Sequence, residues 1–233
     1  IIDYLHHYLP EVSEGKIDYA VLTHYHGDHI GVLTDDMPIH DDGGFTVCGI
    51  TDVGSQIPFK VVYDRGGLYD RPSKNSFSGA TPKRYENYLK YIEWSSKTHG
   101  TERRSAVAGA ADEIRMIHSP ESYAPFSVRT VASNGNVWDG KEDRSSISRM
   151  PSTEELLEIG KGKGCVAENI LSVAHHFRYG EFDWFTGGDC QYIRRDQFDY
   201  LDIETPIAAV MGKVDGMKAG HHSTKGTNSS ELL

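Results

Sequence analysis

The sequence predicts a mixed α/β fold, built as one globular domain. The chain has 233 residues, of which 38% are hydrophobic and 25% are charged, which is the size and balance of a single core. Short β-rich runs recur along the chain, and two segments carry apolar residues at helical spacing. We therefore expect residues 1–233 to form one domain, with an insertion around 139–164.

The first half is expected to combine helices and strands. Residues 1–9 have the i, i+3, i+4 spacing of a helix and no signal-peptide pattern, which indicates a chain that starts inside a domain. Residues 17–23 read IDYAVLT, the pattern of a buried strand that ends at a polar cluster. Gly and Pro punctuate residues 45–64, which favours strands over helices. An N-capping Thr81 followed by proline predicts a helix over 82–97.

The second half is expected to be richer in strands. They are predicted at 114–117, 128–132 and 137–138, and within the runs ILSVAHHF, FDWFT and VDGMKAG. A short helix is expected at 194–201. Ser152 and Glu155 have the spacing of a capping box, which predicts one or two helical turns within the polar insertion. Residues 227–233 have the pattern of a helix N-terminus, so we expect truncation at both ends of the chain.

Composition argues against several classes of function. Thirty-four acidic residues against 24 Lys and Arg give a net charge of −10, so the chain has no overall field that would attract a polyanion. A mean hydropathy of −0.49, without an uncharged apolar run near the roughly 18 residues of a bilayer crossing, predicts no membrane span. Three cysteines without metal-knuckle spacing suggest neither a disulfide framework nor a cysteine zinc site, and leave a cytoplasmic or extracytoplasmic location open. Twelve histidines point toward metal chemistry.

The strongest motif directly follows the strand expected at 17–23. Three imidazoles and a carboxylate occur within six residues, at His24, His26, Asp28 and His29. Alternation along an extended segment places the first two on one side, and a turn at Gly27 lets the other two face them. Imidazole together with carboxylate suits Zn²⁺, Mn²⁺ or Fe, and two such ions can hold a bridging hydroxide. The motif therefore predicts a dinuclear metal site, with Zn²⁺ as the favoured ion.

The order His24-x-His26-x-Asp28-His29 resembles the signature of the metallo-β-lactamase superfamily. That resemblance implies a four-layer αβ/βα sandwich with a dinuclear site at one edge. The run FDWFTGGD is similar to the family's strand that ends in a bridging carboxylate, which implies that Asp189 bridges the two ions. The run KAGHHS is similar to the family's late strand that ends in a histidine ligand, which implies His221 or His222. Spacing does not decide between the two, and His221 is preferred.

More narrowly, three later motifs in order resemble the branch of metallo-hydrolases that includes the extracytoplasmic domain of the DNA-uptake channel protein ComEC. These motifs are Asn169-x-x-Ser172, Gly188-Asp189 and Lys218-x-x-His221-His222-Ser223. The resemblance covers 17–64 and 165–233, and is loose in between.

One histidine of the family pattern has no counterpart here. Family members carry a third histidine upstream of the bridging carboxylate, where this chain reads ENILS. Asn169 or Glu168 would supply an oxygen ligand instead, or His118 would reach in from the middle region, or that site would bind its ion weakly. We expect a dinuclear site of unequal affinity. His175 and His176 are expected to be structural, because neighbours in a strand point to opposite faces.

The resemblance implies a metal-dependent hydrolase, in which a metal-bridging hydroxide attacks the substrate and Asp28 is catalytic, orienting the nucleophile and relaying a proton. A phosphodiester or related phosphoester is the favoured substrate, and the net charge disfavours nucleic acid. The alternatives are a lactone or amide hydrolase of the β-lactamase kind, and an inactive binding module with the same fold. A di-iron redox role would use the same ligands, but no flavodoxin-like segment accompanies them.

Two further groups are assigned no catalytic role. The basic residues of the middle region could steer a phosphate but are expected to lie on a solvated face; they are Lys74, Lys83, Arg84, Arg103 and Arg104. The aromatic residues at 85–94 are expected to pack in the core.

Overall fold

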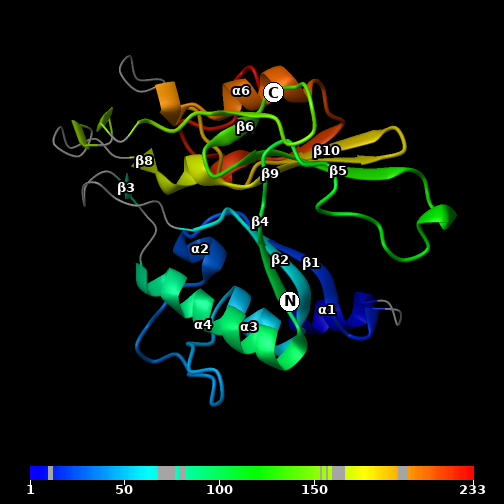
Figure 1. Ribbon diagram of the computed structural model, residues 1–233, viewed down its shortest axis with the longest axis vertical. Coiled ribbons are helices and arrows are strands. Elements are labelled where there is room, and N and C mark those ends of the chain that lie inside the picture. Colours follow the sequence, from blue (N-terminus) through cyan, green and yellow to red (C-terminus); the bar gives the residue numbers. More distant parts are fainter. Residues whose placement is uncertain are drawn as a thin grey trace. The chain divides into compact units, whose positions relative to one another are not determined.

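The computed structural model describes residues 1–9, 13–67, 77–78, 82–152, 154–155, 157–158, 166–193 and 199–233. As predicted, it is mixed α/β, with two main sheets flanked by helices (Figure 1). Its contacts group the chain into two compact units: unit 1 comprises Ile1–Asp64 with Gly79–Ser105, and unit 2 comprises Arg65–Ser78 with Ala106–Leu233. That these units make up one domain of sandwich type stays a prediction.

Unit 1 contains a parallel three-stranded sheet. Its order is β1 (Ile17–Leu22), β2 (Phe59–Asp64) and β4 (Glu102–Ser105). Three helices of this unit contact one another: α2 (Gly27–Ile30), α3 (Ile50–Gln56) and α4 (Pro82–His99) (Figure 1). With α1 (Ile2–Tyr8), these elements confirm the helices predicted near 1–9 and 82–97 and the strand predicted at 17–23.

The prediction of strands throughout 45–64 is wrong for its first part. FKVVYD forms β2, but residues 50–56 form α3. A side chain at Gly54 would place its Cβ 1.9 Å from Tyr91 Oη, so this glycine lets α3 pack against α4. Gly54, one of the glycines that favoured strands in the sequence, instead allows close packing of a helix.

The tyrosines of α4 belong to the core of unit 1, as predicted. Tyr88 and Tyr91 are fully buried. At the end of β2, the buried Asp64 carboxylate accepts hydrogen bonds from Tyr88 Oη at 2.9 Å and from Arg103 Nε at 2.6 Å. Burial, and then the nearby carboxylate, raise the pKa of Tyr88 well above its ordinary value. Arg103 therefore completes a buried polar cluster, and its expected place on a solvated face is wrong.

Unit 2 contains a six-stranded sheet in the order β11-β10-β9-β5-β6-β7. The strands are β5 (Phe126–Ser133), β6 (Asn136–Trp138), β7 (Ser146–Ser148), β9 (Ala174–Tyr179), β10 (Phe182–Thr186) and β11 (Gly216–Lys218). β10 and β11 run parallel, and the other neighbours run antiparallel. A separate ladder joins β3 (Phe77–Ser78) to β8 (Val166–Ala167).

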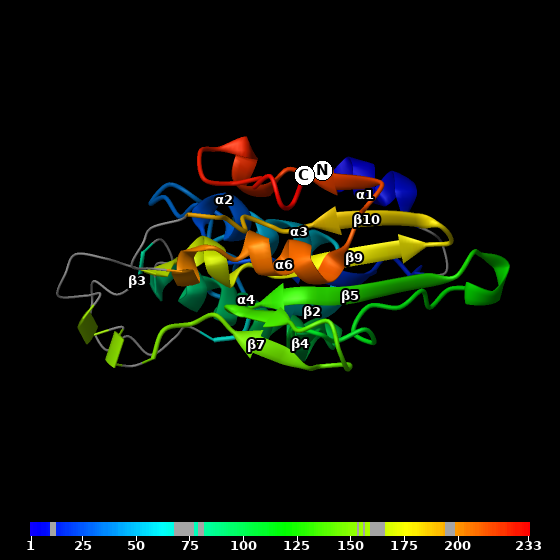
Figure 2. The same cartoon turned by 90° about the horizontal axis from the view of Figure 1, so that it is seen from above.

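The helix α6 (Glu204–Met211) contacts β5 and β6 of this sheet (Figure 2). Ile203, Ile207 and Phe185 are at most 1% exposed within the shared apolar core. The sequence analysis expected a helix at 194–201 instead; residues 194–198 lie outside the described residues, and Asp199–Leu201 is a 3-10 turn. The missed signal is Asp202, whose carboxylate accepts hydrogen bonds from the backbone N–H and the hydroxyl of Thr205 in the first turn of α6.

Most of the other predictions for the second half are confirmed. Strands form at 128–132, at 137–138 and in FDWFT, and VDGMKAG contains the short β11. Residues 114–117 are irregular, and ILSVAHHF divides into a 3-10 turn (Glu168–Leu171) and β9. Ser152 and Glu155 form the reciprocal capping box, at 2.7 and 3.2 Å. The segment 139–164, for which an insertion stays a prediction, also supplies the edge strand β7.

Among the described residues, no helix combines the length and the apolar character that a membrane crossing requires.

A buried ion pair lies inside unit 2. Arg65 Nε and Nη2 donate to the two carboxylate oxygens of Glu168 at 2.6 and 2.9 Å, and both side chains are at most 3% exposed. Arg65 Nη1 also donates to the carbonyl of Gly67 and to Asn134 Oδ1. The pair thus joins the loop after β2 to the turn before β9.

Replacing Glu168 with glutamine should strongly destabilise unit 2, because a buried guanidinium would lose its countercharge. Removal of one partner from such a pair costs about 3–5 kcal/mol. Urea unfolding followed by circular dichroism gives the free energy of unfolding. Glu93→Gln, which breaks an exposed ion pair with Lys97 on α4, is the matched control and should have little effect. Equal effects of the two substitutions would contradict this role of the buried pair.

His175 should make the protein sensitive to acid. Complete burial lowers the pKa of its imidazole to about 4, whereas an unfolded chain protonates at about 6.5. As the pH falls below about 6.5, the unfolded state therefore binds the proton first. Stability that is complete above that pH is lost toward pH 4, by up to about 3 kcal/mol.

The check is urea unfolding at about pH 7 and about pH 4.5 for the wild type and for His175→Gln, the variant being expected to lose less stability over that interval. His6→Gln, on the exposed side of α1, is the control and should behave like the wild type. An unchanged loss of stability in His175→Gln would show that other groups cause the acid sensitivity.

Candidate metal centre

The motif predicted to bind metal lies in unit 1 at the carboxyl end of β1, where the chain turns into α2. His24 and His26 are in the extended connection, and His26 is the N-cap residue of α2. His24 is fully buried. Its Nε2 atom lies 3.0 Å from Nδ1 of His26. Two nitrogens bound to one tetrahedral Zn²⁺, each about 2.0–2.1 Å from the ion, lie about 3.3 Å apart. The two nitrogens are therefore close enough to bind one ion, and at this distance they can also form a hydrogen bond.

Asp28 and His29 follow in the first turn of α2. His29 Nε2 lies 3.6 Å from Asp28 Oδ2, and the His29 ring centroid is 4.1 Å from that of His24. The Asp28 side chain is 56% exposed, whereas that of His29 is 16% exposed. Unit 1 thus brings together the four residues predicted from the motif, with Asp28 on the solvent side.

Thr23 orients two of these rings, a role that the sequence analysis did not assign. Its hydroxyl lies 3.2 Å from His24 Nδ1 and 3.3 Å from His29 Nδ1. Hydrogen bonds to the second nitrogen of a histidine fix its ring and its tautomer, which leaves the other nitrogen for a metal. The sequence feature that would have indicated this role is the hydroxyl-bearing residue directly before the motif.

The packing of unit 1 determines the shape of this turn. Tyr25, between the first two histidines, is fully buried, with its ring centroid 4.8 Å from that of Tyr85 on α4. Behind α2, a side chain on Gly49 would place its Cβ 2.6 Å from the Cα atom of Gly31, so the two backbones meet directly. Both contacts fix the motif between α3 and α4.

Arg84 of α4 also approaches the motif. A Cβ on Gly27 would lie 3.1 Å from the Arg84 guanidinium carbon. Arg84 therefore places a positive charge beside the candidate ligands. Arg84 was expected only to lie on a solvated face, and its contact with the motif was not predicted.

In unit 2, Asp189 follows β10 and is 1% exposed. Its backbone N–H donates to Ser172 Oγ at 3.2 Å. His222 Nε2 lies 3.5 Å from Asp189 Oδ2. Lys218 Nζ donates to the carbonyl of Gly188 at 3.3 Å, which places a positive charge at this turn as well. The acid and a histidine predicted from the resemblance therefore lie together within unit 2.

His221 and His222 lie in a turn after β11 rather than on a strand, so the shared strand face is not the correct criterion for choosing between them. Their φ angles are 41° and 54°, and that of Ser223 is 58°. The left-handed conformation directs the two rings to different partners. His222 faces Asp189, and His221 Nε2 lies 3.1 Å from Asn169 Nδ2. Whether one or both bind metal stays a prediction.

Of the two oxygen donors proposed in place of the missing histidine, Asn169 fits and Glu168 does not. Both carboxylate oxygens of Glu168 are bound by Arg65. Asn169 is 4% exposed, and its Nδ2 contacts Gln191 Oε1 at 3.3 Å as well as His221. Its buried Oδ1 has no hydrogen-bond partner among the described residues. A buried carbonyl oxygen in that state favours a ligand role.

His175 and His176 have contacts within the sheet of unit 2. His175 is buried within β9, and His176 Nε2 lies 2.8 Å from Asp183 Oδ1 of β10, as expected for structural positions. His118 lies in the irregular segment before Pro120. A ligand role for His118 stays a prediction. The convergence of all the predicted ligands on one point stays a prediction as well.

No protein-family model matches this chain, and no curated protein matches it. Among solved structures, Zn²⁺-bound PqqB from Methylobacterium extorquens is similar to it, with 13% sequence identity and a TM-score of 0.32. The match covers 88% of this chain and 56% of the PqqB chain, so the chain spans little more than half of that structure. No residue role follows from a likeness this low.

Thr23→Val should weaken metal binding without unfolding unit 1, because it removes the hydroxyl that orients His24 and His29. Loss of such an outer hydrogen bond costs about 10- to 100-fold in metal affinity. Zn²⁺ affinity is measured by competition with a chromogenic chelator. The control is Thr34→Val, which removes an exposed hydroxyl bonded to Asp36. Unchanged affinity in Thr23→Val would exclude this role.

Proposed function

We propose that the chain is a metal-dependent hydrolase of the metallo-β-lactamase superfamily, in which both units form one αβ/βα domain. Two divalent ions, with Zn²⁺ favoured over Mn²⁺ and Fe, would be held by His24, His26, Asp28, His29, Asp189 and His221 or His222, with Asn169 as the substitute ligand. The observation that carries the proposal is the 3.0 Å approach of His24 Nε2 to His26 Nδ1 beside a half-buried Thr23 contact.

The donors in each unit fit such ions. Unit 1 offers imidazole nitrogens and one carboxylate, a set that suits Zn²⁺, Mn²⁺ or Fe. Unit 2 offers the buried carboxylate of Asp189, an imidazole at 3.5 Å and the unpaired Oδ1 of Asn169. An amide oxygen is a weaker zinc ligand than imidazole, which supports unequal affinity of the two sites.

Two bound ions would lower the pKa of a water between them and offset negative charge at the reacting centre. The chain's own residues then have separate tasks. Asp28 is the catalytic residue: its half-exposed carboxylate orients the attacking water and passes a proton toward the leaving group. Asp189 is 1% exposed, so its carboxylate would hold the ions rather than relay a proton to solvent.

A phosphodiester or related phosphoester is the proposed substrate class. Arg84 lies beside the motif of unit 1, and Lys218 lies beside Asp189 in unit 2. Guanidinium and ammonium groups bind phosphate oxygens and offset their charge in the transition state, whereas a neutral lactone or amide needs neither. The net charge of −10 favours a small phosphoester over nucleic acid. The ComEC-like branch remains part of this proposal on its motif order alone.

The test begins with metal content, measured by inductively coupled plasma mass spectrometry on protein purified without chelator or metal affinity resin. We expect about two ions per chain in the wild type and fewer in Asp189→Ala. Asp199→Ala, which replaces an exposed carboxylate in the same unit, is the control and should keep the wild-type content. No bound metal, even after reconstitution, would overturn the proposal.

Hydrolysis is then compared on bis(p-nitrophenyl) phosphate, nitrocefin and a chromogenic lactone. We expect turnover of the phosphodiester, reduced about 100-fold or more in Asp28→Asn but not in Asp36→Asn, an exposed control. Turnover of nitrocefin or the lactone alone would replace the proposed substrate class. If the protein binds two ions but hydrolyses none of the substrates, an inactive binding module is favoured. The observation that supports this alternative is Asn169, which stands where the family has a ligand histidine.

A further inference from the structure

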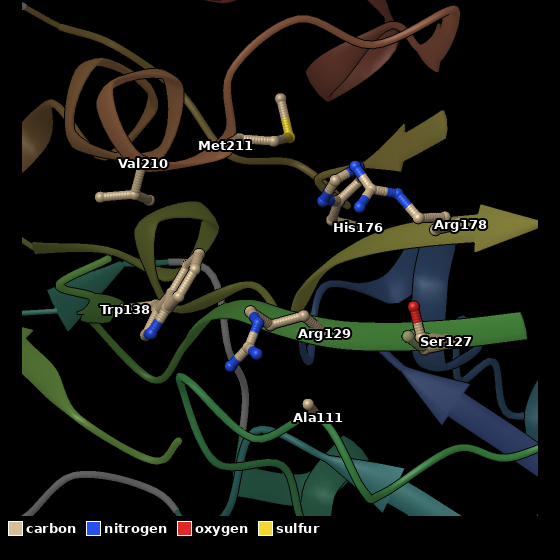
Figure 3. Close-up of a pocket in the computed structure, with 9 residues that line it drawn as sticks. Ala111, Ser127, Arg129, Trp138, His176, Arg178, Val210 and Met211 are labelled. Carbon is tan, nitrogen blue, oxygen red and sulfur yellow. The ribbon is translucent and has the colours of Figure 1, made fainter. Parts of the chain in front are cut away.

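A polar pocket of about 330 Å³ lies in unit 2, at the C-terminal end of α6. Val210 and Met211 line it from the helix, and Arg129, His176 and Arg178 line it from β5 and β9 (Figure 3). None of these residues belongs to the proposed metal site. The pocket borders β9 near the start of β10, whereas Asp189 follows the other end of β10.

Strand register explains why the polar groups converge. Ser127 pairs with Arg178, and Arg129 pairs with His176, across the antiparallel β5 and β9. Paired residues project from the same face of a sheet, so all four side chains meet on one side. Two guanidinium groups, an imidazole and a hydroxyl therefore line one pocket.

The arginines are held in place by groups behind them. Arg178 donates through Nε and Nη2 to Asp183, which also contacts His176. The Arg129 guanidinium carbon lies 4.2 Å from the Trp138 ring centroid, and Nη1 donates to the carbonyl of Gly109. Arg178 Nη1 and the Ser127 hydroxyl have no hydrogen-bond partner in the described part of the chain. These donors are preorganised for an incoming acceptor.

The charge of the pocket contrasts with that of the chain. Its described lining contains two arginines and no acidic residue, although the protein carries a net charge of −10. Asp183 and Asp143 contact Arg178 and Arg129 but do not line the pocket. A concave site lined by arginines without carboxylates favours an anion.

A second groove, of mixed polar and apolar lining, borders this pocket. It measures about 440 Å³ and shares Ala111 and Ser127 with the pocket. Ile114, Met116 and Phe126 contribute to its wall, and Arg115 is the charged residue among its described lining. Ile114 and Met116 therefore offer apolar surface beside the polar pocket.

The geometry points to a second ligand site in unit 2, for a small anionic amphiphile. Its phosphate or carboxylate would bind Arg178, Arg129 and Ser127, and its apolar chain would lie along Ile114 and Met116. Phosphate and carboxylate share the chemistry that two guanidinium groups recognise. This site is independent of metal binding and of the proposed hydrolysis.

The test is isothermal titration calorimetry with decyl phosphate and decanoate, each below its micelle concentration, and with inorganic phosphate and decanol. We expect saturable binding of one or both amphiphiles, about tenfold or more weaker in Arg178→Gln and also weaker in Ile114→Ser. Arg104→Gln, which replaces an exposed arginine on β4, is the matched control and should bind like the wild type. Circular dichroism establishes that each variant is folded.

The two amphiphiles distinguish a phosphate from a carboxylate headgroup, and binding of either supports the site. Inorganic phosphate with equal affinity would overturn the role of the groove, and decanol with equal affinity would overturn the role of the arginines. Absence of binding, or equal binding by folded Arg178→Gln, would overturn the proposal as a whole.

Discussion

The candidate ligands of unit 1 depend on the burial of one tyrosine. Tyr25 lies between His24 and His26 in an extended segment, so its insertion into the core obliges the neighbouring imidazoles to turn the other way. The tyrosine packs against Tyr85 and Tyr88 of α4, and Tyr88 donates to the buried Asp64 at the end of β2. Arg103 of β4 neutralises that carboxylate. The core of unit 1 therefore determines how its candidate metal ligands are oriented.

In unit 2, the orientation of a candidate ligand depends on two adjacent residues. Glu168 and Asn169 are both buried in the same short turn. The ion pair of Glu168 with Arg65 stabilises this turn against the loop after β2, which holds the neighbouring amide toward His221. The charged residue has a structural role and the neutral one faces the candidate site. This division keeps a second carboxylate away from Asp189, where two like charges would repel each other.

The sequence predicted those features that depend on short-range patterns. The motif at 24–29 combines alternation with a turn, and both survive in the folded chain because Tyr25 and Gly27 enforce them locally. The helix at 82–97 was predicted from a capping residue, which lies outside the described residues, and from an apolar stripe. By contrast, α3 was missed because Gly54 serves a distant tyrosine, and the ion pairs of Arg65 and Arg103 join residues far apart in sequence. No local periodicity encodes such partners.

The turn at 221–223 has a consequence for local stability. Three consecutive non-glycine residues in the left-handed region cost about 1 kcal/mol or more each. Asn228 holds the turn from behind, since its Oδ1 accepts from the backbone N–H of Gly220, and the buried Glu204 holds Asn228 in place. Because of this strain, we expect the turn to open more readily than the sheet, so its backbone amides should be less protected from hydrogen exchange. A ligand that binds the imidazoles of His221 and His222 stabilises the closed turn by mass action. Amide hydrogen exchange at 220–224 therefore slows as the site is occupied, and it reports the same equilibrium between the open and the closed turn.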